Sequence, residues 1–234
     1  MTLILSEKEV NDLLTVDLAI EALEHSFAQL ALGKAVDRPR TRTYSPAGHP
    51  GSFYHINSME GIIPSLRMAG IRLNSSIKSW VRRDGVLRAE RGWNQGEERH
   101  SGIVLLFSTE TGELLAIIPD NSISRIRVGC TYAIGSKYLA RPDASSLGML
   151  GSGRHARGVL HAHTRVRALK KVKVYSPTRE HREAFAQQMR EELKLEVKPV
   201  DTLREAIRGV DIVTVVTNAA DRSSSATCSS RACT

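Results

Sequence analysis

Residues 147–156 constrain the fold of this chain more than any other segment. They read Leu-Gly-Met-Leu-Gly-Ser-Gly-Arg-His-Ala, a short apolar stretch followed by a glycine turn and then by a helix pattern. In such a turn Gly151 makes the tight bend, Gly153 lets the backbone approach a pyrophosphate closely, and Ala156 permits close packing of helix on strand. The helix N-terminus beyond offers free N–H groups and a positive dipole end. The pattern predicts a dinucleotide-binding loop; a plain strand–helix turn is the alternative.

The residues around this loop alternate between strand and helix patterns. We expect strands at 147–150, 172–175, near 196–198 and at 211–217, and helices at 155–166, 179–194 and 202–208. Alternation of this kind predicts a parallel sheet with right-handed crossovers. Residues 141–222 are therefore expected to form a Rossmann-type domain, and the fold class of the chain is α/β.

The preceding residues, 1–140, indicate an α+β domain. Ser6 and Glu9 match a capping box, so one helix should start near Glu7, and a second, amphipathic helix should end at Gly33. Apolar runs bounded by turn-forming residues predict strands at 52–56, 68–73, 103–107 and 114–118. The polar, glycine-dotted stretch 79–99 is expected to be a long exposed loop, and a further helix is expected at 121–140.

Composition bounds the function class. The chain has 234 residues, 41% of them hydrophobic, which is ordinary for a soluble globular protein with one large or two modest domains. It contains no run of eighteen apolar residues and no secretory signal pattern, so we expect no membrane span and a cytoplasmic location. The three cysteines are interpreted as free thiols. Helical histidines at 155, 161 and 163 lack metal-site spacing and are expected to be exposed, so no metal site is predicted.

The net charge of +8 raises the question of nucleic-acid binding, because basic chains gain non-specific affinity for phosphates. Arginines and lysines cluster at 38–42, 78–91 and 165–173. These clusters lack interleaved aromatic residues and any known nucleic-acid-binding motif, so we expect no specific nucleic-acid partner. Solvated basic loops are the favoured interpretation, and a nucleic-acid binder remains the alternative.

The segment 223–234 is rich in serine and threonine, has almost no apolar residues and is expected to be disordered. It follows the fourth expected strand of the parallel sheet, where a six-stranded Rossmann fold would continue. Two interpretations are open: a flexible tail, or a chain whose second Rossmann half is missing. The second is favoured.

Three motifs occur in a fixed order: Ser-Arg-Ile-Arg-Val-Gly-Cys-Thr at 124–131, Tyr-Leu-Ala-Arg-Pro-Asp at 138–143, and Gly-Ser-Gly at 151–153. Together with Pro-Arg-Thr at 39–41 and a pattern at 101–116, they resemble the ornithine cyclodeaminase/mu-crystallin family. The resemblance covers residues 3–222 and implies a soluble homodimer with a substrate/dimerisation domain followed by a Rossmann domain. It also implies NAD(H)- or NADP(H)-dependent chemistry on a small amino acid or imino acid, such as ornithine cyclodeamination, alanine dehydrogenation or ketimine reduction.

The resemblance assigns substrate-binding roles to three arginines. Arg127 resembles the family arginine that clamps the substrate carboxylate, and Arg40 resembles its second arginine; a planar guanidinium pairs bidentately with a carboxylate. A solvated helix position is the alternative for Arg127, and a loop charge is the alternative for Arg40. Arg72 stands where the family usually has a lysine. It retains a carboxylate-binding role, but it cannot release a proton, which disfavours true ornithine cyclodeamination.

The family's catalytic aspartate follows the fifth strand of the Rossmann sheet, in a region that this chain lacks, so no catalytic residue is assigned. The leading interpretation is an ornithine cyclodeaminase-like oxidoreductase or deaminase. The alternative is a C-terminally truncated, inactive member of the family that at most binds nucleotide or dimerises.

Cofactor choice depends on the residues after strand 172–175. NAD-specific Rossmann domains place an acidic residue there, whereas this chain has Ser176, Thr178 and Arg179, which suit a 2′-phosphate. We therefore predict NADP(H), with NAD(H) as the alternative; Arg179 would then simply start the next helix and face solvent. The other predicted cofactor residues are Gly151, Ser152, Gly153, Arg154, His155, Ala156 and Thr217.

Overall fold

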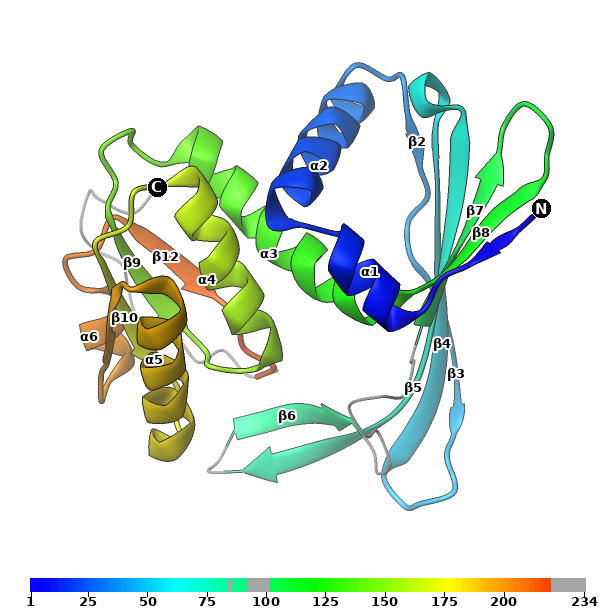
Figure 1. The fold of residues 1–234 in the computed structure, drawn as a ribbon. Helices are drawn as coiled ribbons and strands as arrows, with labels where there is room; N and C mark the ends of the chain where they lie inside the picture. The colour runs from blue at the N-terminus through cyan, green and yellow to red at the C-terminus, as the bar shows by residue number, and fades with distance from the viewer. Residues whose placement is uncertain (84–85, 92–101, 220–234) are drawn as a thin grey trace. The chain divides into compact units, whose positions relative to one another are not determined.

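The structure is a computed structural model that describes residues 1–83, 86–91 and 102–219 (Figure 1). The chain forms two compact units. The first consists mainly of Met1–Thr15 and Glu21–Ser124, and the second mainly of Val16–Ile20 and Arg125–Thr217. Each unit contains one sheet, and the parallel sheet of the second confirms the predicted α/β class. The predicted disordered tail at 223–234 lies outside the described residues.

The first unit is built on an eight-stranded sheet. Its strands are β1 (Leu3–Ile4), β2 (Val36–Asp37), β3 (Thr41–Pro46), β4 (Ser52–Ile63), β5 (Met68–Arg83), β6 (Val86–Arg91), β7 (Gly102–Ser108) and β8 (Leu114–Pro119). They lie in the order β1-β8-β7-β5-β4-β2, with β3 also paired to β4 and β6 to β5. β1 and β8 pair in parallel, and the other pairs are antiparallel.

Two helices precede most of this sheet, α1 (Glu7–Leu13) and α2 (Val16–Ala31), and the 3-10 turn η1 (Pro64–Leu66) connects β4 to β5. The predicted capping box is confirmed, because Ser6 accepts from the Glu9 amide and Glu9 accepts from the Ser6 amide. Gly33 follows α2 with φ +66°, a left-handed conformation that suits glycine and ends the helix there.

The expected exposed loop at 79–99 is wrong wherever the structure describes it. β5 continues to Arg83, and β6 pairs with it antiparallel, so Trp80 lies opposite Ala89 in a β-ladder. A ladder is held by backbone hydrogen bonds, and polar side chains on both faces of an extended strand leave no apolar alternation to detect. Residues 84–85 and 92–101, with Trp93 and His100, lie outside the described part of the chain.

The second unit matches the predicted alternation of strands and helices. It contains β9 (Ser146–Leu150), α4 (Arg154–Val166), β10 (Lys171–Tyr175), α5 (Arg179–Leu193), β11 (Glu196–Pro199), α6 (Leu203–Ile207) and β12 (Ile212–Val215). The strands are parallel, in the order β11-β10-β9-β12. This is the third-second-first-fourth order with which a Rossmann sheet begins.

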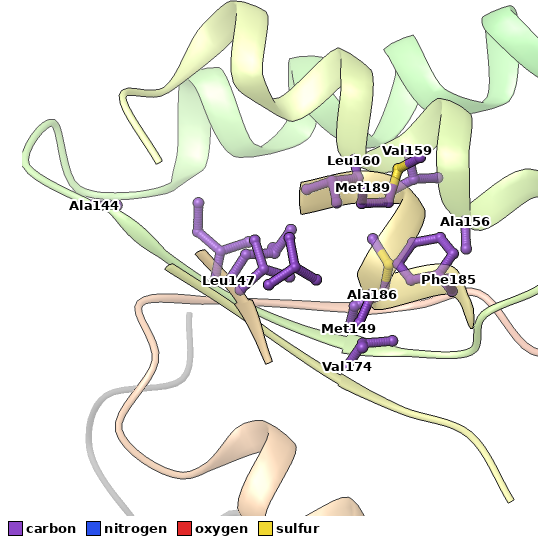
Figure 2. Close-up of a cluster of buried hydrophobic side chains, with 13 residues drawn as sticks. Ala144, Leu147, Met149, Ala156, Val159, Leu160, Val174, Phe185, Ala186 and Met189 are labelled. Atoms are coloured by element: carbon purple, nitrogen blue, oxygen red, sulfur yellow. The ribbon is translucent and has the colours of Figure 1, made fainter. Parts of the chain in front are cut away.

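The core of the second unit lies between its sheet and the helices α4 and α5 (Figure 2). Leu147 and Met149 of β9 and Val174 of β10 are fully buried and contact a cluster that includes Phe185 and Met189 of α5. Every residue of β9 is buried, as expected for a central parallel strand covered on both faces. The continuous apolar run that predicted this strand therefore has a direct structural cause.

The predicted helix at 121–140 is confirmed as α3 (Asp120–Leu139). Its second half belongs to the second unit and crosses α4 closely: a Cβ on Gly129 would overlap the Gly158 carbonyl, and one on Gly158 would lie 3.0 Å from the Arg125 carbonyl oxygen. Two facing glycines therefore fix the distance between these helices. In the described ranges no helix is long and apolar enough to cross a membrane.

Candidate functional site

The turn after β9 requires glycine for reasons internal to the chain. Gly151 has φ +117°, and its amide donates to the Tyr175 carbonyl at 2.7 Å. A Cβ on Gly151 would overlap the Val216 carbonyl, so any larger residue would displace the segment that follows β12. The first glycine of the motif is therefore essential to the packing of β9 against β12.

Gly153 has a different environment. Its φ of −79° suits any residue, and a Cβ built on it would meet no atom within 4 Å. Gly153 is the N-cap of α4, and no side chain caps this helix end. Helix N-termini bind phosphate groups through their first N–H groups and the helix dipole. The open space and the uncapped helix end fit the pyrophosphate of a dinucleotide.

Hydrogen bonds connect the carboxyl ends of three neighbouring strands, the edge at which parallel sheets bind dinucleotides. Ser152 donates to the Ser176 hydroxyl at 2.8 Å, and Ser176 donates to the Thr178 carbonyl at 3.3 Å. The Arg182 guanidinium, whose side chain is 8% exposed, donates to the Ser176 carbonyl at 3.0 Å and pairs with Asp201 beyond β11. Arg182 therefore holds the loop that follows β10.

Neither Arg182 nor Asp201 was identified from the sequence. The signal for Arg182 was available, because it lies three and seven residues before Phe185 and Met189 on the apolar stripe of α5. An arginine inside such a stripe needs buried acceptors, which here are a backbone carbonyl and a carboxylate.

Arg179, expected at the 2′-phosphate, is the first residue of α5. Its side chain is 73% exposed and pairs with Glu183 at 2.7 Å. The hydrogen bond that Arg179 donates to Glu183, followed by the charges of Glu183 and Asp201, raises the pKa of Arg179 above its ordinary value. A bound phosphate would compete with Glu183 for this guanidinium. Thr217 is exposed two residues after β12.

Arg127 lies on α3, two residues before the glycine crossing with α4. Arg127 is half-buried. The crossing packs its helix, α3, against α4, the helix that follows the glycine loop, within the second unit. The facing glycines 129 and 158 therefore determine how closely α3 packs against α4.

The other two predicted substrate arginines lie in the first unit and on neighbouring strands. Arg72 of β5 is in register with Met59 of β4, and the Arg40 Nε donates to the Met59 sulfur at 3.3 Å. Partial burial, followed by the charges of Arg42 and Arg72, lowers the pKa of Arg40. The structure therefore brings Arg40 and Arg72 together on one face of the sheet, and adds Arg42.

Arg72 already has a carboxylate partner. Its Nε donates to Asp120 Oδ1 at 2.8 Å and its Nη2 to Asp120 Oδ2 at 2.5 Å, a bidentate pair in which the side chains are 19% and 4% exposed. Asp120, the first residue of α3, was not identified from the sequence. No short-range pattern connects it to Arg72, because the two are 48 residues apart.

The expectation that the α4 histidines are exposed is wrong for His163, which is fully buried. His163 lies four residues after Val159 on the buried face of α4; its Nδ1 donates to the Val159 carbonyl at 2.7 Å and its Nε2 accepts from Ser136 at 2.9 Å. Burial lowers the pKa of His163. His161 pairs with Glu192 at 2.9 Å. Within the described ranges no cluster of side chains suits a metal ion.

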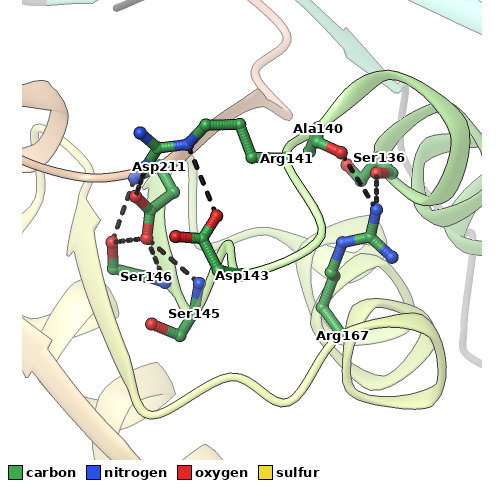
Figure 3. A network of polar contacts seen from close by, with 8 residues as sticks. All are labelled: Ser136, Ala140, Arg141, Asp143, Ser145, Ser146, Arg167 and Asp211. Atoms are coloured by element: carbon green, nitrogen blue, oxygen red, sulfur yellow. Dashed lines mark hydrogen bonds and ion pairs between the residues drawn. The ribbon is translucent and has the colours of Figure 1, made fainter.

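A polar network at the opposite edge of the parallel sheet has a structural role (Figure 3). Asp211, just before β12, accepts from the Ser146 hydroxyl at 2.6 Å, from the Ser145 amide at 3.0 Å and from Arg141 at 2.5 Å. The Ser146 and Ser145 hydrogen bonds lower the pKa of Asp211 to about 2. Arg167 donates to the Ala140 carbonyl at 3.1 Å and so caps α3. This network joins the amino ends of β9 and β12.

A parallel sheet in this strand order, with a glycine turn and an uncapped helix after its first strand, defines a Rossmann-type nucleotide-binding fold. Comparison with protein families then identifies the chain. Residues 1–229 match the model of the ornithine cyclodeaminase/mu-crystallin family, and the chain belongs to that family. The recognition made from the motifs at 124–131, 138–143 and 151–153 is confirmed.

Three relatives illustrate the family. The chain is 28% identical to the ketimine reductase mu-crystallin of Rattus norvegicus over 220 residues, which cover 93% of this chain and 64% of that protein. The structure of Thermococcus litoralis Δ1-pyrroline-2-carboxylate reductase with NADH and L-proline is 28% identical, with a TM-score of 0.75, and the match covers 92% of this chain and 62% of that one. An archaeal alanine dehydrogenase dimer with bound NAD is 27% identical, also with a TM-score of 0.75, and the match covers 92% and 60%. The chain thus spans less than two thirds of each relative.

Proposed function

We propose that this chain belongs to an NAD(P)-dependent oxidoreductase of amino acids or cyclic imines. The observation that carries the proposal is the uncapped start of α4 beside Gly153, where open space and helix N–H groups suit a pyrophosphate. The NADH and NAD bound to the two solved relatives support the same ligand class. In this proposal residues 1–140 form a substrate/dimerisation domain and residues 141–222 form the cofactor-binding domain.

In this proposal the cofactor contacts Gly151, Ser152, Gly153, Arg154, His155, Ala156 and Thr217. Ser176, Thr178 and Arg179 would meet the adenosine ribose, and the absence of an acidic residue from these three positions favours NADP(H) over NAD(H). A nicotinamide cofactor held there would supply or accept the hydride that interconverts the Cα–N bond of an amino acid and the C=N bond of an imine.

Roles in binding a substrate carboxylate are proposed for Arg40 and Arg72 of the first unit and for Arg127 of the second. Fixing the carboxylate orients the Cα–N bond and makes the transfer effectively unimolecular. Arg72 is paired with Asp120 and keeps its proton, so it orients the substrate and transfers no proton. A reductase or dehydrogenase is accordingly favoured over a cyclodeaminating lyase.

A homodimer is also proposed. Ile56, Ile62 and Ile77 are 39%, 38% and 40% exposed, and the strand register places them on the sheet face opposite Met59 and Arg72. Exposed apolar faces of this kind commonly mark protein–protein contacts. The dimer named for the archaeal relative supports this interpretation.

Thermal unfolding with and without NADPH or NADH tests the cofactor site. A cofactor at about a hundredfold excess over its dissociation constant should stabilise the fold by about 2.7 kcal/mol. Arg179→Ala should weaken NADPH binding more than NADH binding, whereas Arg208→Ala, at the far end of α6, should change neither. Equal losses of both cofactors would reject the 2′-phosphate role of Arg179.

Turnover separates the proposal from its alternative, an inactive protein that at most binds nucleotide or dimerises. Oxidation of NADPH or NADH with Δ1-pyrroline-2-carboxylate as substrate supports the proposal. Cofactor binding without turnover of any imine or amino acid supports the alternative.

A further inference from the structure

Three guanidinium groups share one face of the first sheet. Arg42 of β3 is in register with Asn57 of β4, and Arg40 contacts Met59, two residues further along the same strand. Met59 is in register with Arg72 of β5. Because alternate residues of a strand point to one face, Arg40, Arg42 and Arg72 form a single group, which we call the arginine strip.

Arg38 does not belong to the arginine strip, although its spacing from Arg40 and Arg42 suggests that it should. Asp37 is in register with Gly61, and Thr41 is in register with Ser58. The segment from β2 to β3 therefore advances four residues while β4 advances three. This irregularity changes the face, and Arg38 forms an ion pair with Glu60 at 3.4 Å instead. Arg38 is therefore a natural control for the strip.

Within the described ranges, the charges of the strip are balanced only in part. Asp120 pairs bidentately with Arg72. Among the residues that the structure describes, neither Arg40 nor Arg42 has an acidic partner. Partial burial, followed by the charges of Arg42 and Arg72, lowers the pKa of Arg40. Three guanidinium groups and one carboxylate leave two positive charges side by side.

A buried acceptor beside these charges is also unsatisfied by the described part of the chain. Asn57 is 6% exposed, and its side-chain oxygen accepts no hydrogen bond from the described residues. A buried acceptor without a partner destabilises a fold by about 1–3 kcal/mol. The polar groups of this face are therefore not fully satisfied by one another.

We propose that the arginine strip binds a substrate with two carboxylate groups, a dicarboxylic amino or imino acid, in preference to a monocarboxylic one. Arg40 and Arg42 each provide a planar fork for one carboxylate, while Asp120 holds Arg72 in place beside them. A single carboxylate would leave one guanidinium group without a counter-ion. This inference rests on the proposed function for the reaction that follows, but the binding preference needs no turnover.

The test compares L-aspartate with L-alanine, which differ by one carboxylate group on Cβ. Their affinities for the full chain are measured by calorimetry at constant ionic strength, with and without saturating NADPH. We expect L-aspartate to bind at least about tenfold more tightly, since a hydrogen bond to a charged group contributes about 1.5–3 kcal/mol. Arg42→Gln should bring the ratio of the two affinities close to one, mainly by weakening aspartate.

Arg38→Gln removes the same charge from the opposite face and should leave the aspartate/alanine ratio unchanged. Thermal unfolding of both variants checks that they fold. The inference is overturned if the two amino acids bind equally, if neither binds, or if Arg42→Gln and Arg38→Gln reduce the ratio alike. Aspartate preference without turnover of any imine would reject the proposed function and leave the binding site standing. Turnover of monocarboxylic imines without a preference for aspartate would support the proposed function and overturn the inferred preference for two carboxylate groups.

Discussion

The two sheets of this protein bury different kinds of side chain. In the parallel sheet, β9 is buried along its whole length and its core contains Leu147, Met149 and Val174. In the mixed sheet, the residues most buried on β4 and β5 are polar, His55, Asn57 and Ser76, whereas isoleucines on the opposite face are exposed. One sheet is therefore stabilised by its own apolar core, and the other keeps a polar, positively charged face.

This difference indicates where each unit is vulnerable. The parallel sheet depends on tight backbone approaches at Gly148, Gly151 and the crossing of Gly129 with Gly158. The mixed sheet depends on long-range polar pairs, above all Arg72 with Asp120. Substitutions that remove a charge should therefore affect the mixed sheet, and substitutions that add a Cβ should affect the parallel one.

The largest effect is expected for Asp120→Asn. Arg72 would keep its charge in a largely buried position without a counter-ion, and breaking a buried pair from one side destabilises by about 3–5 kcal/mol. Urea unfolding measures the loss. Asp12→Asn breaks the exposed pair with Lys8 and should change the free energy of unfolding by less than about 1 kcal/mol. Similar losses for both variants would show that Arg72 and Asp120 behave as a surface pair.

A loss of about 3 kcal/mol is expected for Gly151→Val, from backbone strain at φ +117° and from overlap with the Val216 carbonyl. Gly153→Ala is the matched variant, because its Cβ has open space. It should cost at most about 1 kcal/mol of stability and still weaken NADPH binding about tenfold, since the methyl group occupies the space proposed for the pyrophosphate. An unchanged affinity of Gly153→Ala for NADPH would show that the glycine loop does not bind the cofactor.

The smallest effect concerns pH and the second unit. Burial lowers the pKa of His163 below 6.5, so the unfolded chain binds a proton more readily than the folded one. The stability that His163 contributes is present above about pH 6.5 and is lost as pH falls through the folded pKa. Urea unfolding between about pH 5 and pH 8 should therefore show a slope that His163→Gln removes. His161→Gln, at a half-exposed position, should retain it; a slope common to all three proteins would assign it to other groups.

Sequence patterns predicted the parallel sheet well, because each of its elements carries its own signal. β9 is a continuous apolar run, α4 follows a glycine turn, and the alternation of strand and helix implies parallel strands. The mixed sheet was predicted only in part. Its charged extension over β5 and β6 gave no apolar alternation, and its pairings join residues far apart in the chain.

The candidate site divides in the same way. The roles of the glycine loop and of Arg40, Arg72 and Arg127 remain predictions, made from local motifs and a family resemblance. Asp120 and Asp201 had no local motif, because each pairs with an arginine 19 or more residues away; for Arg182 the only local signal was its place in the apolar stripe of α5. Their charges were visible in the sequence, and their pairing was not.

The sequence by itself determined the glycine turn, the α4 and α5 packing faces and the family, because backbone conformation and helix periodicity are encoded by near neighbours. Tertiary structure alone decided which arginines are neutralised and which are not. Arg38 pairs with Glu60 and Arg72 with Asp120, whereas Arg40 and Arg42 share one face without an acidic partner in the described chain. The physical reason is strand register: a shift of one residue between β2 and β3 moves a charge to the other face of the sheet.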